Sequence, residues 1–513
     1  MEGVLSGLFV LMQPEVLVFL TIGIIAGLFV GATPGVNDNI AFAVFLPFVF
    51  AMDAATALAF MIGIYCASTI SGAIPAIVLK VPGTVSSLLT AEDGNAMARK
   101  GRGNEAIGIA VTSSVVGGIA SALVLIFLTP ILAAFALRFG PAENFALGVF
   151  AIASVIGMMS GSIFKGILAA AFGLLIAMIG FHHGTSRYTF DNFYFFQGIP
   201  IVPLLVGLFG VAAVLELVEE MVRDRRRELA RADRVETIRA VIPGRAMLRR
   251  LWPTWLRSSA IGNLIGVIPG AGALIAIYLS YDTAARSYTG SAREEAEGVK
   301  WGDGVPEGVA APECANNAVV ASSMVPVLAL GIPGNSVSAL FIAAMELQGL
   351  TPGPLLFQRA LDIAWMVILA FFLVNLLMGP IAFLMVRSLI RFIYAMPKSV
   401  LATMIAFLCL SGAYAVENTF FGIWVALGFG VVGYVFRKTG VPIGPVILAV
   451  ILGERIENSF FNALQLAGWN WWVFFDPIRH PISLVLLIGA ALFLATPLFT
   501  NWRRRRRARR DAA

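Results

Sequence analysis

The feature that most constrains this chain is its succession of long apolar segments. Each is close to the roughly 20 residues that an α-helix needs to cross a bilayer. Continuous apolar runs such as residues 122–132 lack the alternation of polar and apolar residues that marks a transmembrane β-barrel strand. Charged residues make up 13% of the chain, about half of the 25% typical of soluble domains. The sequence therefore predicts an all-α polytopic membrane protein.

These segments predict roughly ten to twelve crossings. Several are interrupted by Pro-Gly pairs, so we expect broken or re-entrant helices among them. The apolar piece 40–50 is too short to cross alone and fits half of such an element. The predicted spans are 16–32, 54–81, 107–132, 145–159, 163–179 and 199–221, followed by 261–281, 317–347, 360–385, 400–416, 420–435, 441–452 and 482–499.

Charge divides the chain into four parts. Residues 223–250 hold ten Arg and four acidic residues, so we interpret 223–257 as a basic cytoplasmic linker under the positive-inside rule. It separates a first membrane half, 1–222, from a second, 258–499, and an Arg-rich tail, 500–513, follows. The N-terminal segment carries Glu2 and Glu15 and has no basic residue before Lys80. We therefore expect the N-terminus outside and the C-terminus in the cytoplasm.

The remaining composition excludes several classes. The net charge of +6 equals the charge of the tail 503–513, which has seven Arg and one Asp. We interpret the tail as a membrane anchor rather than a nucleic-acid site. The three cysteines are isolated in apolar sequence, and the three histidines form no metal motif. No cofactor is expected from these residues.

Two short patterns recur in the same order in both halves. Gly31-Ala-Thr-Pro-Gly35 matches Gly266-Val-Ile-Pro-Gly270. The stretch 74–83 matches 325–334, and in both a Pro-Gly pair follows an earlier Pro by seven residues. The two patterns stand further apart in the second half, and a polar insertion at 283–304 fits the difference. This order indicates an internal duplication, and Gly/Pro-broken segments at matching places in two halves point to a transporter binding site.

The Pro-Gly breaks predict an internal polar pocket. Freed backbone groups are tolerated inside a bilayer only where they are buried or line a wet cavity. A half-helix that begins after such a break points free N–H groups and a positive dipole end at the pocket, which suits a carboxylate. The candidate substrate-binding residues are those of the breaks and the polar residues near them: Pro34, Gly35, Asn37, Pro82, Gly83, Thr84, Ser86, Ser87, Asn316, Asn317, Pro333, Gly334, Asn335, Ser336 and Ser338.

Acidic residues near the breaks give further hypotheses. An ionisable group inside a membrane span is a functional candidate by default, so we interpret Asp38, with Asn37, as a sodium site built from oxygen ligands. Glu313 is expected to flank a helix that begins near Asn316, either as helix-start charge or as a binding residue. The pair Glu92-Asp93 is expected in a cytoplasmic loop.

The motifs together resemble a known family. The stretch 31–108, with Val81-Pro-Gly-Thr84 and Met97-Ala-Arg-Lys-Gly101, is similar to the large permease subunit of the tripartite tricarboxylate transporters, the TctA type. The segment Glu307-Gly-Val-Ala-Ala-Pro-Glu-Cys-Ala-Asn-Asn-Ala318 and the motifs Leu330-Gly-Ile-Pro-Gly334 and Gly349-Leu-Thr-Pro-Gly-Pro354 resemble the same family. The resemblance covers nearly the whole chain.

The resemblance implies a secondary transporter of the bacterial inner membrane, not an enzyme. It implies two partners, a small membrane subunit and a periplasmic solute-binding protein, and uptake of tricarboxylates such as citrate or of dicarboxylates with a cation, often sodium. The predicted outer side is then the periplasm. Two other classes stay open: a passive anion channel, which pore-lining half-helices also fit, and a polytopic membrane enzyme. The chain has no HExxH or GxSxG motif for the enzyme class.

Overall fold

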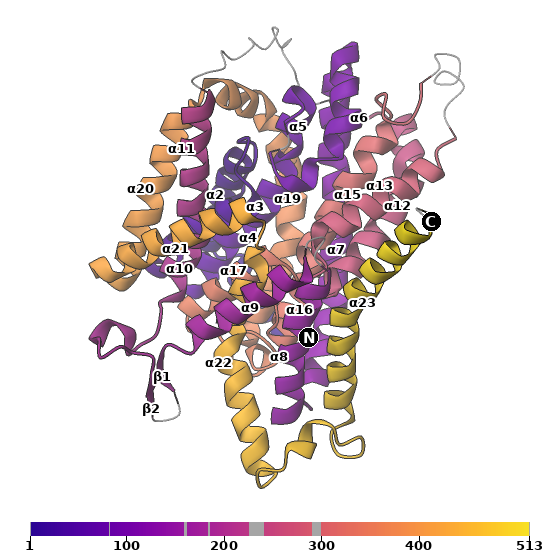
Figure 1. Cartoon of the computed structure of the whole chain (residues 1–513). Helices are drawn as coiled ribbons and strands as arrows, with labels where there is room; N and C mark the ends of the chain where they lie inside the picture. Colours follow the sequence, from indigo (N-terminus) through magenta and orange to yellow (C-terminus); the bar gives the residue numbers. More distant parts are fainter. Residues whose placement is uncertain are drawn as a thin grey trace.

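The protein is an all-α polytopic membrane protein apart from one short hairpin (Figure 1). The computed structural model describes residues 2–81, 83–158, 162–182, 185–224, 241–289 and 299–511. Within these residues, nine helices are long and apolar enough to cross a membrane, and five shorter apolar helices accompany them. The hairpin pairs Gly180 with Arg187 in antiparallel register.

The first half contains α1 (Glu2–Leu11), α2 (Pro14–Gly31), α3 (Asp38–Phe45), η1 (Leu46–Ala51), α4 (Ala54–Ser71), α5 (Ala73–Leu79), η2 (Val85–Ser87), α6 (Thr90–Met97), η3 (Ala98–Arg102), α7 (Gly103–Ala136), α8 (Pro141–Met158), α9 (Ile163–Ala177), β1 (Gly180–His182), β2 (Thr185–Arg187), η4 (Phe193–Phe195), α10 (Ile201–Val206), η5 (Gly207–Val211) and α11 (Ala212–Asp224).

The second half contains α12 (Arg245–Val267), α13 (Gly272–Arg286), α15 (Pro306–Ser322), α16 (Met324–Leu330), α17 (Ser336–Leu347), α18 (Leu356–Arg359), α19 (Leu361–Ala395), α20 (Lys398–Glu417), α21 (Phe420–Thr439), α22 (Ile443–Leu466), η6 (Trp471–Phe474) and α23 (Pro481–Asp511). The ends of the predicted linker 223–257 are therefore helical. Its central residues 225–240 lie outside the described residues, as do residues 512 and 513 of the tail.

The two halves break their helices at equivalent places. The boundary between α4 and α5 falls at Gly72, and that between α15 and α16 falls at Ser323. These two residues stand opposite each other when 74–83 is aligned with 325–334. Both short helices then end in a left-handed residue, Lys80 in the first half and Gly331 in the second. The long helices α7 and α19 have 34 and 35 residues, and each contains an interior proline. Both halves thus follow one plan.

Helices near the end of each half pack against helices of the other half. The segment α10–η5–α11 packs against α20 and α21 of the second half, whereas α22 packs against α8 and α9 of the first. Figure 1 places α11 and α20 toward the top of the view and α8 and α22 toward the bottom. The helices that follow the two long helices, α8 after α7 and α20 after α19, therefore lie toward opposite ends of this view.

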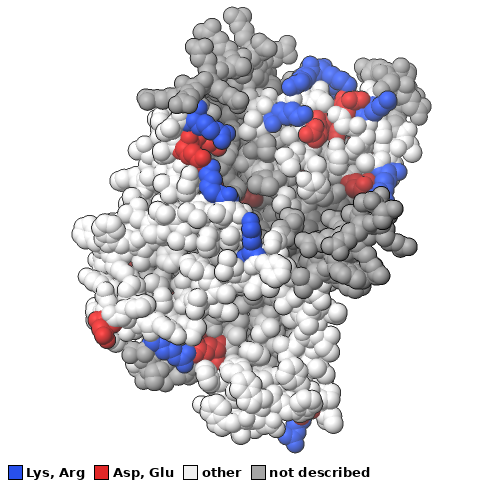
Figure 2. Space-filling view, in the orientation of Figure 1, with Lys and Arg blue, Asp and Glu red and all other residues white. Residues whose placement is uncertain are grey.

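Apolar side chains fill the interior between the broken helices. The helices α4 and α15–α16 are buried almost throughout, while α20, α21 and α23 keep many large apolar side chains on the outside. Figure 2 shows Lys, Arg, Asp and Glu over the upper half of one face, reaching down to about its middle, and again near its lower end, with uncharged surface between the two groups. An apolar outer band with charged ends matches the profile of a bilayer.

Candidate functional site

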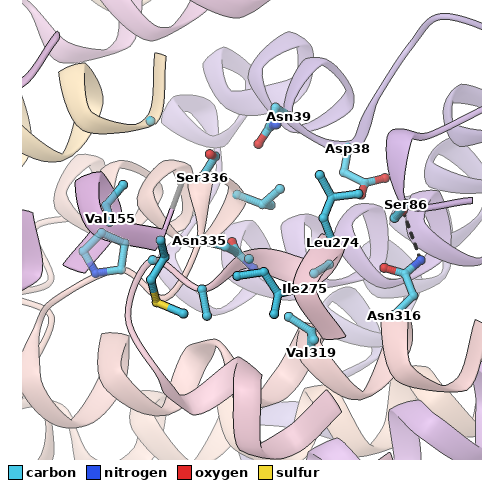
Figure 3. A pocket seen from close by; sticks show the side chains of 18 of the residues that line it. Asp38, Asn39, Ser86, Val155, Leu274, Ile275, Asn316, Val319, Asn335 and Ser336 are labelled. Carbon is cyan, nitrogen blue, oxygen red and sulfur yellow. Dashed lines mark hydrogen bonds between the residues drawn. The ribbon is translucent and has the colours of Figure 1, made fainter. Parts of the chain in front are cut away.

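The broken helices meet at a cavity of about 1050 Å³ (Figure 3). Its walls come from both halves: the starts of α3 and α17, most of α13, the C-terminal parts of α4 and α15, and η2. The end of α8 and the segment between α21 and α22 close another side. The cavity therefore lies where the duplicated elements face each other.

The start of α3 brings three polar residues to this cavity. The chain leaves α2, turns at Gly35, whose φ of 85° favours glycine, and re-enters a helix at Asp38. Asn37 caps this helix, since its side-chain oxygen accepts a hydrogen bond from the Ile40 N–H at 3.0 Å. Asp38 and Asn39 are half-buried, and their Oδ1 atoms are buried without a hydrogen-bond partner among the described residues. Two such acceptors suit a cation or a donor group.

The start of α17 forms a more complete cap. The Asn335 side chain accepts from the Ser338 N–H, and the Ser338 hydroxyl accepts from the Asn335 N–H, both at 2.8 Å. This capping box satisfies two free N–H groups of the helix start. Ser338 is not among the lining residues of the cavity, whereas Asn335 and Ser336 line it.

Two hydrogen bonds join the halves reciprocally across the cavity. The Asn335 amide donates to the Tyr65 hydroxyl at 2.8 Å, and the Asn316 amide donates to the Ser86 hydroxyl at 3.1 Å. Tyr65 and Asn316 stand opposite each other in the alignment of 74–83 with 325–334, so they occupy equivalent positions on α4 and α15. Each of these helices thus holds the segment that follows the Pro-Gly break of the opposite half.

The segment after the first-half break is held by hydroxyl groups. Thr84 bonds Ser86 at 2.8 Å and Ser87 at 3.1 Å, and all three side chains are buried. Only Ser86 of the three reaches the cavity. Gly83 is required sterically, since a Cβ there would meet the Gly72 Cα at 2.9 Å.

The structure brings together part of the predicted set. Asn37, Asp38, Ser86, Asn316, Pro333, Asn335 and Ser336 line the cavity. A second group is not among its lining residues. Pro34, Gly35, Gly83, Thr84, Ser87, Gly334 and Ser338 belong to turns and caps, and Asn317 lies inside α15. Pro82 lies outside the described residues.

Sequence reasoning missed six polar lining residues, namely Asn39, Tyr65, Thr69, Ser162, Tyr278 and Asp282. The repeat could have identified Tyr65, because it is the counterpart of the candidate Asn316. Thr69 has no such signal, since its counterpart, Val320, is apolar.

Two acidic residues correct the sequence expectations. Helix α15 begins at Pro306 rather than near Asn316, so Glu313 lies in its interior, fully buried. The Thr90 and Ser114 hydroxyls donate to the Glu313 carboxylate at 2.6 and 3.2 Å. Asp93 is not in a loop but is buried in α6. Its Oδ1 accepts a hydrogen bond from the N–H of Val305, the residue before α15, at 2.9 Å, so a side chain of α6 caps the start of α15.

No positive side chain is found among the described residues of the cavity wall. The ionisable groups there are Asp38, Asp282 and two tyrosines. Asp282 is exposed and pairs with Arg286 at 2.8 Å, one helical turn along α13. Asp38 has no such partner among the described ion pairs. A bound anion would therefore face an uncompensated acid at the polar end.

The described residues contain no group of three His, Cys, Asp or Glu side chains that could hold a metal ion. A cation at the start of α3 would instead use the Asp38 carboxylate with neutral oxygens, including Asn39 and backbone carbonyls. Such a set suits a weakly held alkali ion better than a transition metal, which prefers nitrogen and sulfur ligands.

Comparison with known proteins finds relatives over nearly the whole chain. Residues 17–448 match the model of the tripartite tricarboxylate transporter TctA family. An uncharacterized 52.8 kDa protein in the TAR-I ttuC′ 3′ region of Agrobacterium vitis is 31% identical over 483 residues, which are 94% of this chain and 93% of that protein. A second uncharacterized protein of Agrobacterium vitis, from the TAR-II ttuC′ 3′ region, is 31% identical over 226 residues, 44% of this chain and 89% of that protein. No solved structure matches.

Proposed function

Because the chain belongs to the tripartite tricarboxylate transporter TctA family, we propose that it takes up carboxylate anions by secondary active transport coupled to a cation gradient, with sodium as the coupling ion. The proposed substrates are tricarboxylates or dicarboxylates. The single observation that carries this proposal is the cavity. Its polar end combines two helix starts with an acid that has no ion-pair partner and no basic neighbour among the described lining residues.

Helix starts can replace a basic clamp for the anion. The starts of α3 and α17 each point backbone N–H groups and a positive dipole end toward the cavity. Hydroxyl and amide donors of Ser336 and Asn316 stand beside them. These groups attract a carboxylate without neutralising it, so the remaining charge calls for a co-bound cation.

The membrane potential gives a second reason for coupling. An inside-negative potential opposes an incoming anion by about 2.3 kcal/mol per charge per 100 mV. A trivalent anion faces three times that, about 7 kcal/mol per 100 mV. Accumulation therefore requires enough sodium ions to neutralise the substrate, and one more gives a net driving force. We propose at least two sodium ions per dianion and more per trianion.

The proposed sodium site lies at the start of α3. Asp38 supplies the carboxylate, and its buried Oδ1 has no partner among the described residues. Asn37 contributes an oxygen that already accepts from Ile40 but keeps a second lone pair. The adjacent Asn39 Oδ1 is a further ligand in this proposal.

The partners and orientation follow from the family and the charge distribution. We propose that the chain works in the bacterial inner membrane with a small membrane subunit and receives substrate from a periplasmic solute-binding protein. The N-terminus is proposed to be periplasmic and the C-terminus cytoplasmic. Cysteines introduced at Ser6 and Ala512 test this orientation: an impermeant reagent added outside whole cells should label only Ser6→Cys, and equal labelling would contradict it.

Uptake into proteoliposomes tests the function. The chain is reconstituted with its small subunit and binding protein, and labelled citrate is offered with and without an inward sodium gradient. We expect accumulation above the external concentration only with sodium and the binding protein. Equilibration without accumulation would indicate a passive channel, and sodium-independent accumulation would refute sodium coupling.

A further inference from the structure

The cavity has two chemically different sides. The polar side carries Asn37, Asp38, Asn39, Tyr65, Asn316 and Asn335, from α3, α4, α15 and α17. The other side is mostly apolar and carries Val155, Met158, Leu274, Ile275, Val319 and Leu448, from α8, α13, α15 and α22, with Tyr278 and Asp282 further along α13. Figure 3 shows Asn39 and Asp38 in the upper part of the cavity and Ile275 and Val319 in the lower part, with Leu274 between them.

This contrast arises from substitution within the repeat. When Gly31–Gly35 is aligned with Gly266–Gly270, the residues opposite Asn37, Asp38 and Asn39 are Gly272, Ala273 and Leu274. Both triplets open a helix after a Pro-Gly break, and both line the cavity. The duplicated backbone is therefore polar on one side and apolar on the other.

The apolar side stays accessible to a ligand. Leu274 keeps 41% of its surface exposed although it lines the cavity. An apolar ligand group would cover this surface and gain the hydrophobic free energy of its burial. A carboxylate at the same place would leave water without a hydrogen-bond donor to replace it, which is strongly unfavourable.

The charges of the cavity point in the same direction. Three of the side-chain amides among the described lining residues, Asn37, Asn39 and Asn335, lie at the starts of α3 and α17, whereas Asn316 stands one turn before Val319 on α15. Asp38 limits how much negative charge the polar side accepts. A ligand with carboxylates spread around its whole surface, as in citrate, would turn at least one of them toward Leu274 or Val319. A ligand with its charge at one end avoids that contact.

We propose that the preferred substrate is an amphipathic carboxylate, with one or two carboxylates at one end and an apolar aromatic or aliphatic body at the other. The carboxylate end binds beside Asp38 and the two helix starts, with sodium, and the body lies against Leu274, Ile275 and Val155. This inference rests on the proposed function and specifies its substrate class.

Direct binding to the purified chain in nanodiscs tests the proposal, because it excludes the selectivity of the binding protein. Malonate and benzylmalonate form a matched pair: both carry two carboxylates on one carbon, and only the second has an apolar body. With sodium present, we expect benzylmalonate to bind at least about tenfold more tightly than malonate or citrate.

A single substitution gives the apolar side the polar residue of the equivalent position. Leu274→Asn places there the residue found at the equivalent position, Asn39. It should reduce the preference for benzylmalonate over malonate by about tenfold. Leu274→Met keeps the wall apolar and should retain the preference. Since the readout is a ratio within one preparation, partial loss of folded protein does not change it.

The outcomes separate this inference from the proposed function. Sodium-dependent binding of citrate or malonate that equals or exceeds that of benzylmalonate would overturn the amphipathic substrate and leave carboxylate transport standing. Binding of none of the three with sodium would count against both. A benzylmalonate preference that survives Leu274→Asn unchanged would also overturn the placement of the body.

Discussion

The starts of α3 and α13 occupy the same place in the two halves, yet they differ in every side chain that faces the cavity. The first offers Asn37, Asp38 and Asn39, and the second offers Gly272, Ala273 and Leu274. The backbone plan is shared, with a Pro-Gly turn before each helix. The duplication thus supplied two similar scaffolds, and the difference between their side chains gives the cavity a charged end and an apolar end.

The largest expected effect comes from removing the charge of Asp38 at the start of α3, where the equivalent position of α13 is Ala273. Asp38→Asn keeps the shape of the side chain but removes the proposed sodium ligand. We expect sodium-dependent uptake in proteoliposomes to fall about 100-fold, because a charged hydrogen-bonding group is worth up to about 3 kcal/mol. Asp362→Asn, an exposed site at the start of α19, is the matched control. Equal losses in both variants would remove Asp38 from the site.

Alanine substitutions of the two glycines in the Pro-Gly turns test how similar the two turns are in conformation and packing. Gly35 and Gly270 both have positive φ, 85° and 79°, so alanine at either position should cost about 1–2 kcal/mol of stability. A Cβ at Gly270 would also meet the Val155 backbone nitrogen at 2.7 Å, whereas Gly35 faces open space. Gly270→Ala should therefore cost about 1–2 kcal/mol more than Gly35→Ala.

Thermal unfolding of both purified alanine variants measures this difference. A lower midpoint for Gly270→Ala is expected. The same midpoint for both would mean that the end of α8 moves aside without cost, and that the two turns are equivalent in packing as well as in conformation.

The reciprocal hydrogen bonds between the halves predict a smaller effect. Tyr65→Phe removes the bond to Asn335, and Asn316→Ala removes the bond to Ser86. Each should weaken sodium-dependent ligand binding about three- to tenfold, since such a bond contributes about 0.5–1.5 kcal/mol. Tyr414→Phe, on the partly exposed face of α20, should leave binding as it is. Weaker ligand binding in only one of the two variants would show that the two hydrogen bonds contribute unequally to binding.

The smallest expected effect concerns the other acid of the cavity. Asp282 is 54% exposed and already paired with Arg286, and an exposed ion pair contributes little. Asp282→Asn should change uptake by less than about twofold. A loss comparable to that of Asp38→Asn would show that the negative charge acts through the whole cavity rather than at the start of α3.

The sequence could predict the features that depend on local chemistry. A Pro-Gly pair favours a turn, and Asn is a preferred residue at a helix start, so the turn at Gly35 and the caps at Asn37 and Asn335 follow from nearby residues. The fold class follows from hydropathy alone. The repeat, visible in two short patterns, extends in the structure to the break at Gly72 and to its equivalent at Ser323.

The rest depends on contacts between distant residues. Glu313 follows Gly308 and Pro312, a pattern typical of a loop, yet α15 runs through it because α7 and α12 pack against this helix. Asp93 stands in a charged stretch of the first half, but it caps a helix that belongs to the second half. Tyr65 and Thr69 reach the cavity only because α4 crosses α17, and no local pattern signals that crossing.

The most direct test of the account measures sodium and substrate together. Radioactive sodium and labelled carboxylate are followed into proteoliposomes that contain the chain, its small subunit and its binding protein. We predict that sodium enters only with the carboxylate, in excess of its negative charge, and that Asp38→Asn lowers both fluxes about 100-fold. Carboxylate accumulation with no accompanying sodium, or a sodium flux unchanged by Asp38→Asn, would contradict a cation-coupled site at the start of α3.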